Sequence, residues 1–291
     1  MSAGYGKNTE EAMGRETRLH DTGRFVLDPG QLQAIAASRC GEYRSADPFP
    51  HIVIDDLLPE EALTRVRSEI PMPNDIRWTE FDDARGKKLA SKAETQLGAA
   101  TRFLLYQLNS SIFLEFLETL TGIRGLIPDP HLWGGGVHQI ERGGFLKIHA
   151  DFNRHPTLNL DRRLNLLLYL NPGWQEEWGG RLELWNKDVT ECRKKILPIF
   201  GRCVVFNTTD FSYHGHPDPL NCPDGETRKS LALYYYSNGR PREEIAASHY
   251  STPFRRRPGE KVFLTPEIIA QNLLPPIVMS MISLLRERRR R

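Results

Sequence analysis

Two histidines and one aspartate have the residue types needed to bind a metal ion. His149 and Asp151 end a strand-like stretch, residues 144–148, and in an extended chain the side chains of residues i and i+2 point to the same face. His214 follows a second apolar stretch, residues 203–207, much later in the chain. Two histidines and one carboxylate on one side of a metal leave positions open for a chelating cosubstrate and O2. Alone, however, a histidine and an acid at this spacing more often mark an exposed polar face.

Arg228 adds a second element of such a site. It precedes an apolar strand, residues 230–236, in which Arg228 and Ser230 share one face while Tyr235 points to the other. A ferrous oxygenase that uses 2-oxoglutarate needs a cation deep in its barrel for the far carboxylate. A guanidinium suits this task because it binds a carboxylate through two hydrogen bonds.

Residues 144–240, about a third of the chain, resemble the prolyl 4-hydroxylase branch of the Fe(II)/2-oxoglutarate-dependent dioxygenases, which includes the hypoxia-factor and collagen-type prolyl hydroxylases. The features that carry the resemblance stand in order: His149-Ala150-Asp151; Arg162, Leu168-Tyr169-Leu170-Asn171 and Trp174; Trp178-Gly179-Gly180-Arg181-Leu182-Glu183-Leu184; Tyr213-His214-Gly215-His216-Pro217; Arg228-Lys229-Ser230.

The resemblance implies a role for each matching residue. His149, Asp151 and His214 would be iron ligands and would act in catalysis together with Arg228, which would anchor the cosubstrate. Tyr169 matches a family tyrosine that hydrogen-bonds the same carboxylate. Three further residues are candidates for binding the cosubstrate: Ser230, Gln139 at a position where several relatives have a tyrosine, and Asn165. The cofactors implied are Fe(II), with 2-oxoglutarate and O2 as cosubstrates, and ascorbate.

Two features depart from the family pattern. The spacing from His214 to Arg228 is longer than in human relatives, with residues 219–227 forming an inserted turn at the mouth of the cleft. A second histidine, His216, competes with His214 as the metal ligand. His214 is favoured because the family ligand directly follows an aromatic residue and precedes a small one.

The pattern around these residues predicts the fold. From residue 131 to 237, short apolar runs alternate with glycine and proline turn signals, which is typical of an all-β sandwich or barrel. We therefore predict an α+β, mainly β protein with a double-stranded β-helix (jelly-roll or cupin-like) core at about residues 131–240. N-terminal helices at about residues 59–122, broken near Asn109, would buttress it. Residues 78–92 are polar and are expected to form a mobile loop at the cleft.

Composition sets the expected domains and location. The 291 residues are 39% hydrophobic and 26% charged with a net charge of +2, which fits a soluble globular protein without a nucleic-acid partner. Four cysteines without a CxxC pair favour a reduced compartment, so we expect a cytoplasmic protein. The sequence leaves the oligomeric state open.

The two ends differ from the expected dioxygenase domain, residues 25–245. Residues 1–24 lack the apolar stretch of a signal peptide or membrane anchor and are expected to be disordered. Residues 246–291 form an extension whose apolar part is too short to span a bilayer, so no transmembrane segment is predicted. A docked terminal helix with a basic end is favoured over a helix that binds a membrane surface or an acidic partner.

The predicted activity is hydroxylation of an aliphatic carbon, with succinate and CO2 as coproducts. The substrate could be a small amino acid, a peptidyl residue including proline, or a natural-product intermediate, because fold does not fix substrate. A non-catalytic, cupin-like metal or small-molecule binding protein is the alternative, and Arg228 argues against it. Asp151 disfavours halogenation, and the sequence has no HExxH-like helix for a hydrolytic zinc enzyme.

Overall fold

The computed structural model describes residues 26–91, 93–244 and 252–260. The chain divides into two compact units, residues 1–256 and 257–291. The first unit contains the strands and helices named below, and it extends past the predicted domain end at residue 245. The N-terminal segment 1–24 and the C-terminal basic helix lie outside the described residues. Within the described residues, no helix is both long and apolar enough to cross a membrane.

Within residues 26–244, four α-helices precede most of the strands: α2 (Pro29–Ser45), α3 (Glu60–Ser68), α4 (Ala99–Leu108) and α5 (Ser111–Thr121). The side chain of Asp28 accepts a hydrogen bond from the Gln31 backbone N–H (2.7 Å), and Pro29 follows it, so the start of α2 is both capped and preorganised. The break between α4 and α5 at Asn109 confirms the predicted interruption.

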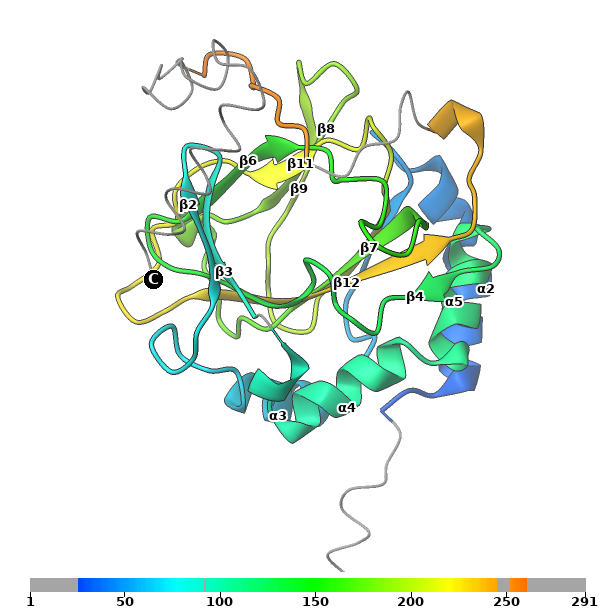
Figure 1. Cartoon of the computed structure of the whole chain (residues 1–291), viewed down its shortest axis with the longest axis horizontal. Coiled ribbons are helices and arrows are strands. Elements are labelled where there is room, and N and C mark those ends of the chain that lie inside the picture. The colour runs from blue at the N-terminus through cyan, green and yellow to red at the C-terminus, as the bar shows by residue number, and fades with distance from the viewer. Residues whose placement is uncertain (1–25, 92, 245–251, 261–291) are drawn as a thin grey trace, which may run out of the picture. The chain divides into compact units, whose positions relative to one another are not determined.

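The strands form one antiparallel sheet in the order β1-β10-β7-β12-β5-β3-β6-β11-β8-β9, with β2 paired to β3 and β4 to β12. Figure 1 shows that these strands curl into a ring, with the helices packed beside β7, β12 and β4. The strand bounds are β1 (His51–Ile54), β2 (Thr79–Asp83), β3 (Gly86–Ala90), β4 (Ile127–Pro128), β5 (Gly136–Ile140), β6 (Phe145–His149), β7 (Asp161–Tyr169), β8 (Leu182–Trp185), β9 (Cys192–Ile196), β10 (Cys203–Asn207), β11 (His214–His216) and β12 (Arg228–Ser237). This architecture is the mainly β core with helical support that the sequence predicts.

The alternation of side chains along β12 separates the core from the site. Leu231, Leu233 and Tyr235 pack in the large apolar cluster with the helices, and the Tyr235 hydroxyl donates a hydrogen bond to the Leu108 carbonyl oxygen (2.8 Å). Arg228 and Tyr234 take the opposite face, as the period of two predicts. Burial of the outer face fixes the phase of β12, so its inner face presents polar groups to the interior of the ring.

The expected mobile loop at residues 78–92 is wrong, because this segment forms the hairpin β2–β3. β3 pairs with β5 through Leu89 and Ala90 and with β6 through Gly86 and Lys87. The hairpin has a polar sequence because one of its faces is exposed to solvent. It is held in the sheet by pairing with β5 and β6, which are distant in the sequence. The segment therefore belongs to the wall of the ring.

Candidate metal centre and cosubstrate pocket

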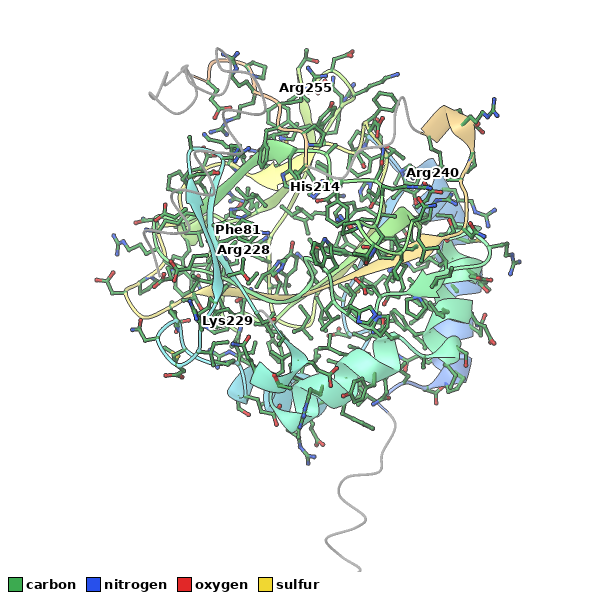
Figure 2. The ribbon with its side chains drawn as sticks, viewed as in Figure 1. Phe81, His214, Arg228, Lys229, Arg240 and Arg255 are labelled. Carbon is green, nitrogen blue, oxygen red and sulfur yellow. The ribbon has the colours of Figure 1, made fainter. Side chains whose placement is uncertain are left out.

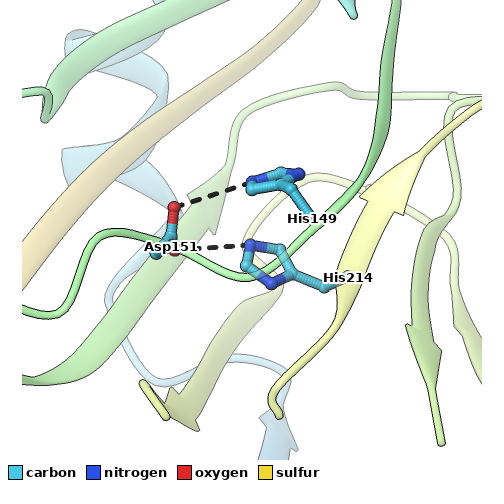
Figure 3. Close-up of side chains that lie close together, drawn as sticks. All are labelled: His149, Asp151 and His214. Carbon is cyan, nitrogen blue, oxygen red and sulfur yellow. Dashed lines mark ion pairs between the residues drawn. The ribbon is translucent and has the colours of Figure 1, made fainter. Parts of the chain in front are cut away.

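The three predicted metal ligands lie together at one end of paired strands. His214 in β11 stands opposite His149 in β6, and Asp151 follows directly after β6. His149 Nε2 lies 3.6 Å from Asp151 Oδ1, and His214 Nε2 lies 3.5 Å from Asp151 Oδ2 (Figure 3). One potential ligand atom from each residue lies within 4.8 Å of the others, a spacing that fits a single metal ion. His216 is not part of this group, which favours the choice of His214.

Backbone contacts orient both imidazoles toward Asp151. The Nδ1 atom of His149 lies 2.8 Å from the Lys147 carbonyl oxygen, and Nδ1 of His214 lies 2.9 Å from the Ser212 carbonyl oxygen. A carbonyl oxygen accepts a hydrogen bond, so Nδ1 carries the proton and Nε2 is left with its lone pair for a metal.

The electrostatics keep these groups in the protonation states that metal binding requires. Burial, together with the charge of His149, lowers the pKa of His214 to about 4. Burial acts to raise the pKa of Asp151, but Arg162, His214 and His149 together hold that pKa well below its usual range. At neutral pH His214 is therefore neutral and the Asp151 carboxylate is ionised, as metal ligands must be.

Arg162 and Asn165, both on β7, hold the Asp151 carboxylate in place. Asp151 Oδ2 accepts hydrogen bonds from Arg162 Nη2 (3.0 Å) and Asn165 Nδ2 (2.5 Å), and Asn165 Oδ1 accepts one from Arg162 Nε (3.0 Å). The guanidinium also stacks on the ring of Tyr234, 3.4 Å from its centroid. Asn165 was expected to bind the cosubstrate, but its side chain contacts the metal ligand instead.

Loss of the Asn165 amide should loosen the metal centre. We expect Asn165→Leu to lower Fe(II) affinity by about 10- to 100-fold, the range typical for partners of metal ligands, because Asp151 loses a hydrogen bond that fixes its direction. Competition with a chelator measures this change. A suitable control is Asn171→Leu, because the buried Asn171 amide bonds the Pro198 and Lys229 carbonyl oxygens away from the triad. That variant should be less stable but should bind iron normally. Equal iron affinity in Asn165→Leu and the wild type would contradict this role.

Arg228 places a second cation inside the ring of strands (Figure 2). Its side chain is buried, Nε donates to the Gly180 carbonyl oxygen (2.8 Å), and Nη2 donates to the Tyr169 hydroxyl (3.2 Å). A Cβ atom on Gly180 would lie 2.9 Å from Arg228 Cδ, so this close approach requires glycine. Burial lowers the Arg228 pKa, and no carboxylate of the described residues pairs with it. The guanidinium is thus a buried cation whose charge no carboxylate of the described residues neutralises.

His216 is a buried polar group without a hydrogen-bond partner in the part of the chain that the structure describes. It is buried, and neither of its ring nitrogens has a hydrogen-bond partner among the described residues. Burial and the charges of Arg228 and Lys88 lower its pKa well below the usual value. An unsatisfied buried polar group costs about 1–3 kcal/mol. The arrangement therefore indicates a polar ligand beside Arg228 and His216.

The two remaining cosubstrate candidates lie on different faces. Ser230 pairs with Tyr169 and His138, so it shares the inner face. Gln139 lies on the outer face of β5, where its Nε2 donates to the Pro71 carbonyl oxygen (2.5 Å) and its Oε1 accepts from the Thr227 hydroxyl (2.8 Å). These contacts place Gln139 outside the pocket, and His138 occupies the inward position beside it.

Residues 252–256 form a part of the site that the sequence does not indicate. Phe254 pairs with His149 in a β-bridge, framed by hydrogen bonds from Ala150 N to the Pro253 carbonyl oxygen (3.1 Å) and from Arg255 N to the Ile148 carbonyl oxygen (2.8 Å). The Phe254 ring lies 5.3 Å from the His149 ring, measured between centroids. This segment therefore covers the metal ligand with an aromatic side chain.

A comparison with protein families matches residues 135–236 to the 2OG-Fe(II) oxygenase superfamily. The matched stretch contains His149, Asp151 and His214, which the structure brings together, and it also contains Arg228. Residues 135–236 are a 2OG-Fe(II) oxygenase domain. The predicted family is thereby confirmed. Strand β3 and residues 252–256, which also contribute to the site, lie outside the matched residues.

Prolyl hydroxylases are among the proteins similar to this oxygenase. Mouse prolyl 3-hydroxylase OGFOD1 is 23% identical over 225 residues, which are 73% of this chain but only 36% of the mouse protein. A Trichoplax adhaerens prolyl hydroxylase, solved with a hypoxia-inducible-factor peptide, is 17% identical and covers 75% of this chain and 96% of its own, with a TM-score of 0.50. A Pseudomonas putida prolyl-4-hydroxylase is 18% identical, and the match covers 70% of this chain and 100% of the Pseudomonas chain, with a TM-score of 0.48. The likeness to the Trichoplax enzyme confirms the double-stranded β-helix fold.

Proposed function

We propose that this oxygenase uses Fe(II), 2-oxoglutarate and O2 to hydroxylate an unactivated aliphatic carbon, with succinate and CO2 as coproducts. The observation that supports this proposal best is a two-histidine, one-carboxylate group in the same ring of strands as a buried arginine that pairs with no carboxylate of the described residues. A metal-binding protein without turnover has no use for that arginine. The cupin-like alternative is therefore disfavoured.

The residues of the pocket fit these cofactors. His149, Asp151 and His214 would hold Fe(II), which prefers such a mixed set of imidazole and carboxylate donors. Arg228 and the Tyr169 hydroxyl would bind the far carboxylate of 2-oxoglutarate, and His216 would donate to the same molecule and so satisfy its unpartnered ring. When bound, Fe(II) and 2-oxoglutarate supply the oxidative chemistry.

The protein's own contribution is orientation and exclusion of water. Arg162 and Asn165 orient the Asp151 carboxylate by hydrogen bonds. The carbonyl oxygens of Lys147 and Ser212 orient the imidazoles of His149 and His214. Phe254 covers His149, while the Phe152 ring, 4.4 Å from the Arg162 guanidinium carbon, closes the side beside Asp151. A dry site strengthens each of these electrostatic contacts.

We further propose an amino-acid or peptidyl substrate, with prolyl residues as the first candidates. The names of the mouse and Trichoplax relatives support this choice. A natural-product substrate is the second choice. Ascorbate as a supporting reductant and a cytoplasmic location stay predictions.

Succinate formation tests this function. Purified protein with Fe(II), 2-oxoglutarate and O2 should form succinate above its background rate when a substrate is added, and mass spectrometry should detect a product heavier by one oxygen atom. The variant Asp151→Ala should form no succinate under the same conditions. Succinate release that is independent of all three predicted ligands would contradict the proposal.

A further inference from the structure

Lys88 carries a third positive charge into the pocket. In β3, Ala90 pairs with His138 of β5, which lies on the inner face, so the period of two places Lys88 on that face as well. Lys88 stands opposite Phe81 in the β2–β3 hairpin, and its ammonium lies 4.8 Å from the centroid of the Phe81 ring. Phe81, labelled in Figure 2, is itself about half exposed. Lys88 and Phe81 therefore form a pair of side chains at the rim of the site.

Among the residues that the structure describes, no carboxylate is free to neutralise Lys88. Its ammonium interacts electrostatically with Asp151, Arg162 and Arg228, of which only Asp151 is negative. Asp151 is already bound by Arg162 and Asn165 and faces the two histidines. Asp83, at the end of the same hairpin, pairs with Arg85 at 2.8 Å. Among the described residues, Lys88 is therefore a cation without an anion of its own.

The proposed cofactors leave this charge unbalanced too. Fe(II) would bring two positive charges, and Arg162, Arg228 and Lys88 carry one each, whereas Asp151 carries one negative charge and 2-oxoglutarate would bring two. Lys88 interacts electrostatically with both Asp151 and Arg228, and its strand β3 pairs directly with β6, which ends at the predicted metal ligand His149. Burial, with the charges of Arg162 and Arg228, lowers the Lys88 pKa to about 8. An anion beside Lys88 would remove this unfavourable environment.

We propose that Lys88 binds an anionic group of the substrate, so that this oxygenase acts on amino acids or peptides that present a carboxylate close to the hydroxylated carbon. The inference rests on the proposed function and specifies its substrate class. Phe81 provides an apolar surface beside the ammonium for the aliphatic part of such a substrate. Fixing the carboxylate at Lys88 would hold the neighbouring carbons at a constant distance from the metal ligands.

The test compares N-acetyl amino acids with their neutral amides, N-acetyl-L-proline and N-acetyl-L-prolinamide first. Binding is measured without O2, as the change that each compound causes in the visible absorption band of the protein loaded with Fe(II) and 2-oxoglutarate. At least one acid should bind about tenfold more tightly than its amide. We expect a smaller effect than for a fully buried charge pair, because Lys88 is only half-buried. Lys88→Met should remove this preference, and Lys88→Arg should retain part of it.

Lys87→Met is a matched control, because Lys87 is the next residue in β3 and points to the exposed face. It should keep the preference for acids. Equal binding of every acid and its amide by the wild type, or an acid preference that survives in Lys88→Met, would overturn the inference. So would a loss of 2-oxoglutarate affinity in Lys88→Met as large as that in Arg228→Ala, since Lys88 would then be a cosubstrate ligand. A wild-type protein without the visible band would instead contradict the proposed function itself.

Discussion

Replacing Asp151 with alanine should abolish iron binding. The variant loses the one carboxylate of the metal group. It also leaves the buried Arg162 guanidinium without its anionic partner, and this positive charge would repel a divalent cation from the site. Anaerobic addition of Fe(II) and 2-oxoglutarate should then fail to produce the weak visible band of a chelated keto acid, and chelator competition should show no tight iron site. Asp151→Asn keeps the shape of the side chain, so it tests the charge alone if the alanine variant folds poorly. A band of wild-type intensity in both variants would show that the metal site lies elsewhere.

The two candidate histidines of β11 give the matching comparison. His214→Ala should lose iron because it removes an imidazole whose Nε2 faces Asp151. His216→Ala should retain iron and bind 2-oxoglutarate more weakly, because His216 lies outside the metal group and beside Arg228. The opposite pattern would make His216 the ligand.

The parts of the site that the sequence predicts are those fixed by local periodicity. His149 and Asp151 are two residues apart, and Arg228 and Ser230 begin a strand whose outer face must be buried against the helices. Burial of one face sets the phase of such a strand, so a pattern of two decides which side chains point inward. Periodicity explains why His149 and Asp151 share a face and why Arg228 points inward, whereas the choice of His214 and the role of Arg228 came from the resemblance to the family.

Gln139 shows where the same reasoning fails. The sequence Gly136–Ile140 has no alternation of apolar and polar residues from which a face could be chosen. Its phase is set by pairing with β12 and β3, where Ser230 and Ala90 stand opposite His138. Gln139 was predicted from its spacing to His149, but its neighbour His138 is the residue that faces the inside of the ring.

Long-range pairing also explains the features that no local pattern indicates. Between the pairs His149–His214 and Leu146–His216, two residues of β6 stand against one residue of β11, and this irregularity cannot be read from either strand alone. Phe254 reaches His149 only because residues 252–256 return to the edge of β6. Lys88 lies in a segment whose polar composition is typical of a loop, and its inward direction depends on where β3 joins the sheet.

Arg228→Ala should weaken 2-oxoglutarate binding more than any other change in the pocket while leaving iron bound. The guanidinium would be the charged partner of the far carboxylate, and it lies on β12 away from the metal group. Truncating one partner of a buried charge pair costs about 2 to 5 kcal/mol, which is roughly thirty- to several-thousand-fold in affinity. Arg228→Lys should recover only part of this loss, because an ammonium cannot donate the two parallel hydrogen bonds of a guanidinium.

The measurement is succinate formation as a function of 2-oxoglutarate concentration, with bound iron determined in the same samples. Tyr169→Phe provides the graded comparison: it removes the hydroxyl that accepts from Arg228 Nη2 but keeps the ring on which the guanidinium stacks, so its effect should be smaller than that of Arg228→Ala. Loss of iron together with 2-oxoglutarate in Arg228→Ala would indicate general disruption of the barrel, and Arg228→Lys would then have to separate the two effects. An unchanged dependence on 2-oxoglutarate in Arg228→Ala would contradict the cosubstrate assignment, because Arg228 is the cation proposed to hold the far carboxylate.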